Sequence, residues 1–85
     1  MSAPDRRRVA RAFGIVLRTA RMGAGLSQHQ LARAAHVSNN TPGLLERGVL
    51  QPTMHTLIVL ADALGIQATL LVIMTVGRLR REGQP

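Results

Sequence analysis

Two adjoining segments decide the fold of this chain: Leu26-Ser27-Gln28-His29-Gln30-Leu31-Ala32 and, after a short turn, Val37-Ser38-Asn39-Asn40-Thr41-Pro42-Gly43-Leu44-Leu45-Glu46-Arg47-Gly48. Ser27 has a side chain that can cap a helix N-terminus, and Gln30, three residues later, can complete a capping box. Ser38 can cap a second helix after the turn at residues 35–37. Two capped helices this close together predict a helix-turn-helix over residues 28–47, an arrangement that can present its second helix to a DNA major groove.

Length and composition predict a single all-α domain spanning residues 1–85. A chain of 9.2 kDa can form one modest core and is too small for a substrate cleft with a lid, which disfavours an enzyme. Hydrophobic residues make up 46% of the chain, yet Phe13 is its one aromatic residue. A core built from Leu, Ile, Val, Ala and Met suits packed helices better than a sandwich of sheets.

Capping residues and apolar spacing predict the first three helices. The first helix is expected to follow a capping-box arrangement of Ser2 and Asp5 around Pro4 and to end near residues 23–25. The next two are expected over about residues 28–35 and 39–47. With Ser38 as the N-cap of the third helix, Pro42 is its fourth residue and loses only the hydrogen bond to the cap carbonyl. Pro42 and Gly43 are therefore expected to weaken this helix without breaking it.

Two further helices complete the expected five-helix bundle. Thr53 can cap the fourth helix and Gly65 can end it. Its expected inward stripe consists of Met54, Leu57, Ile58, Ala61 and Leu64. The fifth helix is expected over residues 68–82.

The fifth helix is apolar nearly all round at residues 68–76, which is more than one small core can hide. It can pack wholly against its own domain, but self-association through this helix is favoured. The expected dimer-interface residues are Leu70, Leu71, Ile73, Met74 and Val76.

The apolar run at residues 57–76 approaches the length of a membrane span, but Asp62, Gly65 and Gln67 interrupt it, so no membrane insertion is expected.

The charge of the chain favours a polyanionic partner. The net charge is +7, and arginine is the only basic residue besides histidine. Six arginines lie in residues 1–21 and three in residues 78–82, so the charge sits at the two ends of the chain. The basic segment at residues 1–8 contains the first candidates for phosphate contacts, Arg6, Arg7 and Arg8. The alternative is that these arginines only keep exposed faces soluble.

The order and spacing of these motifs resemble the phage-repressor and Cro-type helix-turn-helix family, the XRE family of bacterial transcriptional regulators. The resemblance covers residues 13–71 and rests on Phe13-Gly14, Leu17-Arg18, Arg21, Leu26-Ser27-Gln28, Leu31-Ala32, Val37-Ser38, Glu46-Arg47-Gly48, Pro52, Leu57, Leu60-Ala61 and Ala63-Leu64-Gly65-Ile66. The Glu46-Arg47-Gly48 ending and the length resemble restriction-modification controller proteins in particular. The resemblance implies a sequence-specific regulator of double-stranded DNA, acting as a dimeric repressor or controller without a cofactor.

The resemblance also implies roles for individual residues. Asparagine amides on the recognition helix can bond adenine, and a helix N-terminus can hold a phosphate. The candidates for base contacts are Asn39, Asn40, Thr41, Gly43 and Leu44. The candidates for phosphate contacts are Arg6, Arg7, Arg8, Gln28, Ser38 and Arg47. Arg21 and Glu46 match a structural pair of the family, although they can also be two independent surface charges.

Two residues depart from the family pattern. His36 stands where the turn usually has glycine, and it can adopt a positive φ at some cost. Pro42 stands where the third helix usually has a branched apolar residue. Both departures are expected to reduce the precision of base reading and to leave the fold intact.

Other functional classes find little support in the sequence. His29, His36 and His55 have no nearby cysteine and no metal-ligand spacing, so neither a catalytic site nor a metal site is expected. The lack of cysteine and of a signal peptide fits a cytoplasmic protein. Two alternatives remain: an antitoxin that binds a toxin partner, and a membrane-surface or protein-docking module that uses the apolar last helix and its arginine-rich end.

Overall fold

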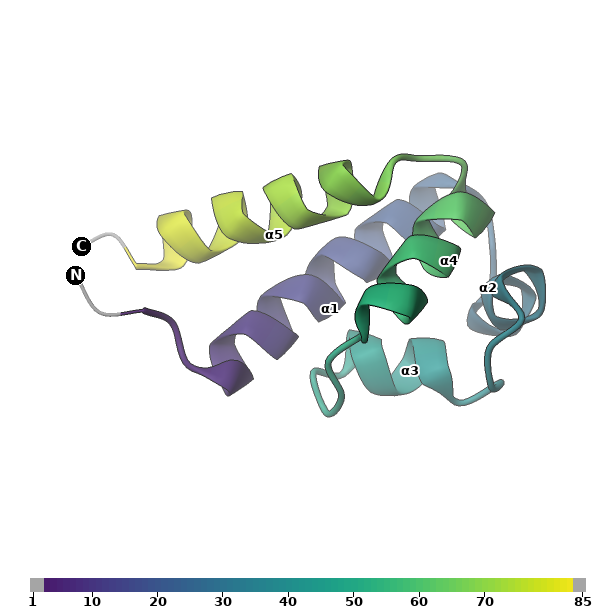
Figure 1. Ribbon diagram of the computed structural model, residues 1–85, viewed down its shortest axis with the longest axis horizontal. Helices are drawn as coiled ribbons and strands as arrows, with labels where there is room; N and C mark the ends of the chain where they lie inside the picture. The colour runs from purple at the N-terminus through teal and green to yellow at the C-terminus, as the bar shows by residue number, and fades with distance from the viewer. Residues whose placement is uncertain (1–2, 84–85) are drawn as a thin grey trace.

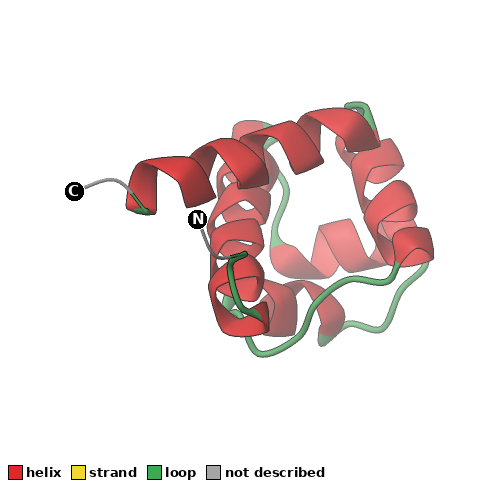
Figure 2. Ribbon diagram, turned by 60° about the vertical axis from the view of Figure 1, so that its left-hand side comes forward, coloured by secondary structure: helices red, strands yellow, loops and turns green. Residues whose placement is uncertain are grey.

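The computed structural model describes residues 3–83 and places five helices around one core (Figure 1). The helices are α1 (Arg6–Gly23), α2 (Gln28–Ala35), α3 (Thr41–Glu46), α4 (Met54–Leu64) and α5 (Ala68–Glu82). Figure 2 shows only helices and connecting loops over the described residues. The expected all-α, five-helix fold is therefore confirmed.

Ser27 and Thr53, the caps expected from the sequence, begin two of the helices, and Asp5 begins a third. Ser2, the other member of the expected first capping box, lies outside the described residues. Asp5 Oδ1 accepts a hydrogen bond from the Arg8 amide at 2.9 Å at the start of α1. The Ser27 hydroxyl accepts from the Gln30 amide at 3.0 Å, and the Gln30 side chain accepts from the Ser27 amide at 2.8 Å. This reciprocal capping box satisfies two amides that have no partner within the helix. Thr53 caps α4 through the Thr56 amide at 3.1 Å.

The expected start of the third helix is wrong. Ser38 belongs to the turn before it: the Ser38 carbonyl accepts from the Thr41 amide at 2.9 Å, and the Ser38 hydroxyl accepts from the Asn40 amide at 3.4 Å. Helix α3 begins at Thr41, so Pro42 lies in its first turn. Amides in a first turn have no acceptor within the helix, and proline is well tolerated there. Pro42 is also fully buried, and at this position its missing N–H costs the helix no hydrogen bond.

All five helices contribute side chains to one core. Figure 1 shows α5 running antiparallel to α1 on one side, with α2, α3 and α4 grouped on the other. Helix α1 contacts α5 and α3, and α2 links α3 to α4. The central side chains, which are almost or fully buried, are Phe13, Leu17, Leu31, Leu45, Leu60 and Leu71.

Two expected apolar faces differ from those observed. Leu71, expected at a dimer interface, is fully buried in the protein's own core, and Met74 packs against that core. In α4, Met54 and Ile58 are exposed, whereas Leu60 takes an inward position that was not expected. Both helices carry apolar residues on more than one face, so periodicity alone could not select the buried one.

No single helix within residues 3–83 is long and apolar enough to cross a membrane. Helices α4 and α5 meet the length and composition requirement only as a pair, and they are bent by 106° where they join.

Candidate nucleic-acid interface

Helices α2 and α3 form the helix-turn-helix, and the turn between them depends on His36. His36 ends α2 with a left-handed backbone at φ 58°, as expected for this position, and it is the only described residue other than glycine with a positive φ. The Val37 amide then donates to the Ala32 carbonyl at 3.0 Å, which ties the turn back onto α2. The chain is thereby directed into residues 38–40 and α3.

A shallow depression of about 370 Å³ lies at the junction of α2 with the start of α3. It is lined by Gln28, Asn39, Asn40, Gly43, Leu44 and Arg47. Four of these side chains carry amide or guanidinium groups. Asparagine can bond adenine in a bidentate fashion, and arginine can bond guanine or a phosphate. The depression therefore offers chemistry for both base edges and the DNA backbone.

Not all candidate base-contact residues reach this depression with a side chain. Asn39 and Asn40 are exposed in the turn that precedes α3, rather than on its first turn as expected. Thr41 is half-buried at the start of the helix and does not line the depression. Gly43 is buried, and a Cβ added there would lie 3.2 Å from the Gln28 Oε1 atom. Gly43 can therefore offer only its backbone, and it makes room for the Gln28 side chain.

The candidate phosphate contacts fall into two groups. Gln28 and Arg47 line the depression, and Ser38 is exposed in the turn between α2 and α3. Arg6 and Arg7 are exposed at the start of α1, away from these residues in the fold. Arg8 is half-buried and leans toward the end of α5, where its Nη2 atom would lie 3.6 Å from a Cβ on Gly83.

Arg21 and Glu46 form a bidentate ion pair between α1 and the end of α3. Arg21 Nε donates to Glu46 Oε2 at 2.6 Å, and Arg21 Nη2 donates to Glu46 Oε1 at 3.1 Å. A third donor, Arg21 Nη1, bonds the Leu26 carbonyl at 2.8 Å. The Arg21 and Glu46 side chains are only 13% and 5% exposed. Paired donors and acceptors of this geometry bind more strongly than single charged contacts.

Glu46 also holds a residue of the depression. Gln28 Nε2 donates to Glu46 Oε1 at 3.1 Å, so one carboxylate joins α1, α2 and α3. The sequence suggested Gln28 only as a phosphate contact and gave no sign of this bond, because the two residues lie eighteen positions apart. The bond fixes the Gln28 amide at the rim of the depression.

The same pair affects the ionisation of Arg21. The hydrogen bond to Glu46 raises the pKa of Arg21, partial burial opposes this increase, and the negative charge of Glu46 adds to it. A raised pKa stabilises the folded state at every pH below the ordinary arginine value and is lost only above it. Arg21 therefore stays charged throughout the range in which the protein can be studied.

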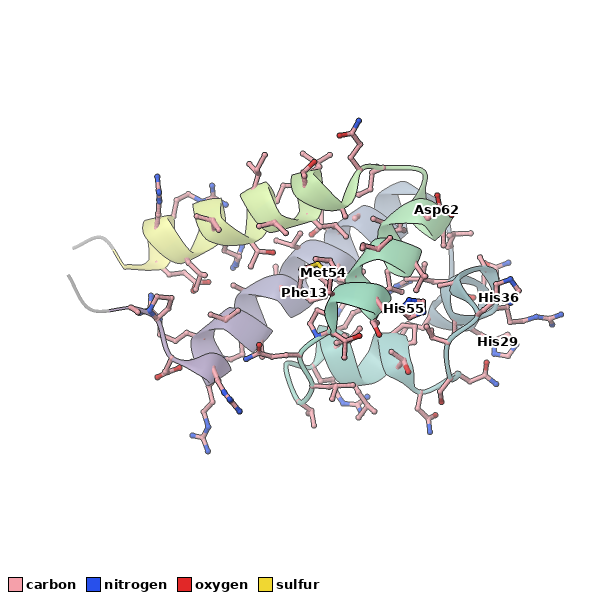
Figure 3. All side chains as sticks on the ribbon, in the orientation of Figure 1. Phe13, His29, His36, Met54, His55 and Asp62 are labelled. Carbon is pink, nitrogen blue, oxygen red and sulfur yellow. The ribbon has the colours of Figure 1, made fainter. Side chains whose placement is uncertain are left out.

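The histidines do not form a second site. Figure 3 shows His29 and His36 together at the α2 end of the molecule, whereas His55 lies on α4. Within residues 3–83, no three His, Asp, Glu or Cys side chains come close enough to hold a metal ion.

Comparison with known proteins identifies the family. A family model described as "Helix-turn-helix domain" matches residues 12–72, which is most of the chain. The chain belongs to this helix-turn-helix family. The resemblance to phage-repressor-type regulators drawn from the sequence is confirmed, and the family consists of DNA-binding regulators rather than enzymes. A search of curated proteins gave no significant match.

Solved structures of helix-turn-helix regulators share this fold. The clp gene regulator ClgR from Corynebacterium glutamicum is 30% identical, with a TM-score of 0.76 over 89% of this chain and 95% of that one. The restriction-modification controller protein C.AhdI from Aeromonas hydrophila is 34% identical, with a TM-score of 0.71 over 73% of this chain and 94% of that one. A hypothetical transcription factor, NHTF from Neisseria, is 25% identical, with a TM-score of 0.75 over 94% of this chain and 92% of that one.

Removing one partner of the ion pair should destabilise this helix-turn-helix domain. Arg21→Ala leaves the Glu46 carboxylate, 5% exposed, with Gln28 as its remaining side-chain donor. We expect a loss of about 2 kcal/mol in the free energy of unfolding, because a buried charge without its partner is costly. Denaturant unfolding followed by circular dichroism measures this change.

The second ion pair of the described residues provides a matched control. Arg78 donates to Glu82 at 3.0 Å within α5, and both side chains are more than a third exposed. Arg78→Ala should change the stability by no more than about 0.5 kcal/mol, because exposed pairs contribute little. Equal effects of Arg21→Ala and Arg78→Ala would show that the Arg21–Glu46 pair does not hold α1 to α3.

Proposed function

We propose that this protein is a cytoplasmic, homodimeric transcriptional repressor or controller that binds double-stranded DNA sequence-specifically through α3 and the turn before it. The observation that carries the proposal is the depression at the α2–α3 junction. It gathers the amides of Asn39, Asn40 and Gln28 with the Arg47 guanidinium. Donors and acceptors of this kind read base edges in the major groove and grip the adjacent phosphates.

The exposed apolar face of α5 supports the homodimer. Leu70, Ile73 and Val76 of the expected interface are exposed, and so is Val72, which was not among the expected residues. A groove of about 440 Å³ adjoins this face at the α4–α5 junction. It is lined by Ile58, Val59, Ala61, Asp62, Ile66, Gln67, Ala68 and Thr69. A twofold dimer would place two recognition helices about 34 Å apart on a palindromic site.

Alanine substitution in the turn before α3 tests the base-reading role. Asn39→Ala or Asn40→Ala should weaken binding to the cognate site by about 1–3 kcal/mol and leave binding to random DNA nearly unchanged. Mobility shifts with the DNA upstream of the gene, beside a random duplex of equal length, measure both affinities.

His29→Ala is the matched control for these substitutions. His29 is exposed on α2, in the same helix-turn-helix, but it does not line the depression. His29→Ala should leave the affinity for both the cognate and the random duplex unchanged. Equal losses on cognate and random DNA for the asparagine variants would assign Asn39 and Asn40 to backbone contacts instead.

The apolar face of α5 also supports a second candidate function, that of an antitoxin whose partner is a toxin rather than a second copy of this chain. Four exposed aliphatic side chains in one helix, Leu70, Val72, Ile73 and Val76, suit any protein partner with a complementary apolar surface. Co-expression with the product of the neighbouring gene, followed by size-exclusion chromatography, distinguishes the two. A stable complex of unlike chains supports the antitoxin, and a dimer of this chain alone supports the regulator.

A further inference from the structure

Arginines from both ends of the chain come together at one end of the fold. Helices α1 and α5 run antiparallel, so the start of α1 and the end of α5 lie at the left-hand end of the molecule in Figure 1. We call the arginines at this end the basic pole. It consists of Arg6, Arg7, Arg8, Arg11, Arg78, Arg80 and Arg81.

Arg8 links the two parts of the basic pole. Its Nη2 atom lies 3.6 Å from the position that a Cβ on Gly83 would occupy, just beyond the end of α5. The side chain is half-buried, whereas Arg80 and Arg81 are exposed on the last turn of α5. Arg8 of the first arginine cluster therefore reaches the end of α5, the helix that carries the second cluster.

The positive charge of the basic pole is largely uncompensated. Its nearby acidic residues are Asp5, which caps α1 through the Arg8 amide, and Glu82, which pairs with Arg78. The described residues contain no ion pair for Arg80 or Arg81. Concentrated like charges repel one another, and a polyanion that binds there relieves this repulsion.

A short loop connects the basic pole to the depression that reads DNA. Arg47 lines the depression, and Gly48, which follows it, turns back against Arg11 with a left-handed backbone at φ 74°. Gln51 Nε2 then donates to the Arg6 carbonyl at 2.9 Å. Residues 48–51 thus tie the start of α1 to the end of α3. This continuity favours one DNA molecule spanning both surfaces.

We propose that the basic pole is a second phosphate-binding surface, which holds the DNA backbone outside the base pairs read at the depression. The proposal rests on the proposed function, and it adds Arg80 and Arg81 of α5 to the DNA contacts. Guanidinium groups suit this role because they bind phosphate oxygens in pairs. Each protomer should therefore bind DNA that extends beyond its half-site more tightly than DNA that ends there.

The test compares two duplexes that contain the same operator. One ends at the operator, and the other has ten further base pairs on each side. The double variant Arg80→Ser with Arg81→Ser should bind the longer duplex about tenfold more weakly than the wild type, with a salt dependence less steep by about two phosphate contacts per protomer. Its affinity for the trimmed duplex should change less than about twofold.

A variant of equal net charge serves as the control. Arg18 and Arg33 are exposed, lie outside both the basic pole and the depression, and have no ion pair within residues 3–83. Arg18→Ser with Arg33→Ser should weaken binding to both duplexes slightly and equally. Arg6→Ser with Arg7→Ser tests the α1 side of the basic pole and should reproduce the loss on the longer duplex. Circular dichroism confirms that each variant is folded.

Three outcomes would overturn the proposal. The basic-pole variants could bind the longer duplex as well as the wild type does. Alternatively, their affinity could fall equally for both duplexes, as expected for the control. They could also lose binding to phosphatidylserine vesicles while keeping all DNA binding, which would assign the basic pole to a membrane surface. The preference of the wild type for operator over random DNA tests the proposed function separately. The difference in affinity between a longer and a trimmed duplex can be measured with either operator or random sequence.

Discussion

Gly14→Ala should destabilise this protein more than alanine at any other glycine within its described helices. A Cβ at Gly14 would press against the Leu45 carbonyl oxygen and lie 2.7 Å from the Glu46 carbonyl oxygen. Both atoms belong to the backbone of α3, so no side chain can rotate away and α1 must move off α3. We expect a loss of about 3 kcal/mol or more in the free energy of unfolding, the upper part of the range for overpacking.

The expected loss is large relative to the whole stability of a small domain. Domains of this size unfold with about 5–15 kcal/mol, so Gly14→Ala removes a substantial fraction. The melting temperature should fall by about 10–20 °C. Differential scanning calorimetry of the wild type beside Gly14→Ala measures this shift directly.

Gly23 provides the matched control within the same helix. It is the last residue of α1, and a Cβ there would meet nothing within 4 Å. Because alanine has a higher helix propensity than glycine, Gly23→Ala should raise the free energy of unfolding by about 0.5 kcal/mol. A Gly14→Ala variant as stable as Gly23→Ala would contradict the close approach of α1 to α3.

The sequence predicted the fold best where local chemistry determines it. Ser27 and Thr53 begin α2 and α4, as expected from their hydroxyl groups, and Gly65 ends α4 with a left-handed backbone, as expected for a residue without a Cβ. These features depend on residues within one turn of each other. The family assignment followed from the order of such local motifs, and the match over residues 12–72 confirms it.

The start of α3 could not be predicted in the same way. Ser38 and Asn40 are both acceptable residues before a helix, and Pro42 is tolerated in a first turn. In the structure α3 begins at Thr41, with Pro42 fully buried in its first turn. Asn39 and Asn40 therefore belong to the turn rather than to the helix, which changes how their amides can approach DNA.

Contacts between distant parts of the chain were also beyond the sequence. The bond between Gln28 and Glu46 and the approach of Arg8 to Gly83 both depend on how whole helices cross. The inward face of α5 depends on α1 in the same way. A helix that is apolar nearly all round gives no periodic signal for the side that will be covered.

Ile73→Asp should dissociate the proposed dimer and weaken operator binding together. Ile73 is 65% exposed in a single protomer, the most exposed large apolar side chain of α5. An aspartate there is hydrated in the monomer, so the fold should survive. In a dimer that buries this face, the carboxylate loses its water without gaining a partner. We expect the dimer to weaken at least about 100-fold, since a buried unpaired charge costs several kcal/mol.

Sedimentation velocity of the wild type and Ile73→Asp, with mobility shifts on a two-half-site operator, measures both effects. Met22→Asp is the control, because Met22 is 58% exposed on α1. This substitution adds the same charge outside α5. A dimer has two recognition helices on one DNA, so its loss should remove most operator affinity and leave contacts with a single half-site. A wild-type monomer at tens of micromolar would contradict the dimer. An Ile73→Asp variant that dimerises and binds the operator as Met22→Asp does would also contradict it. The apolar face of α5 would then be a binding surface for a different protein.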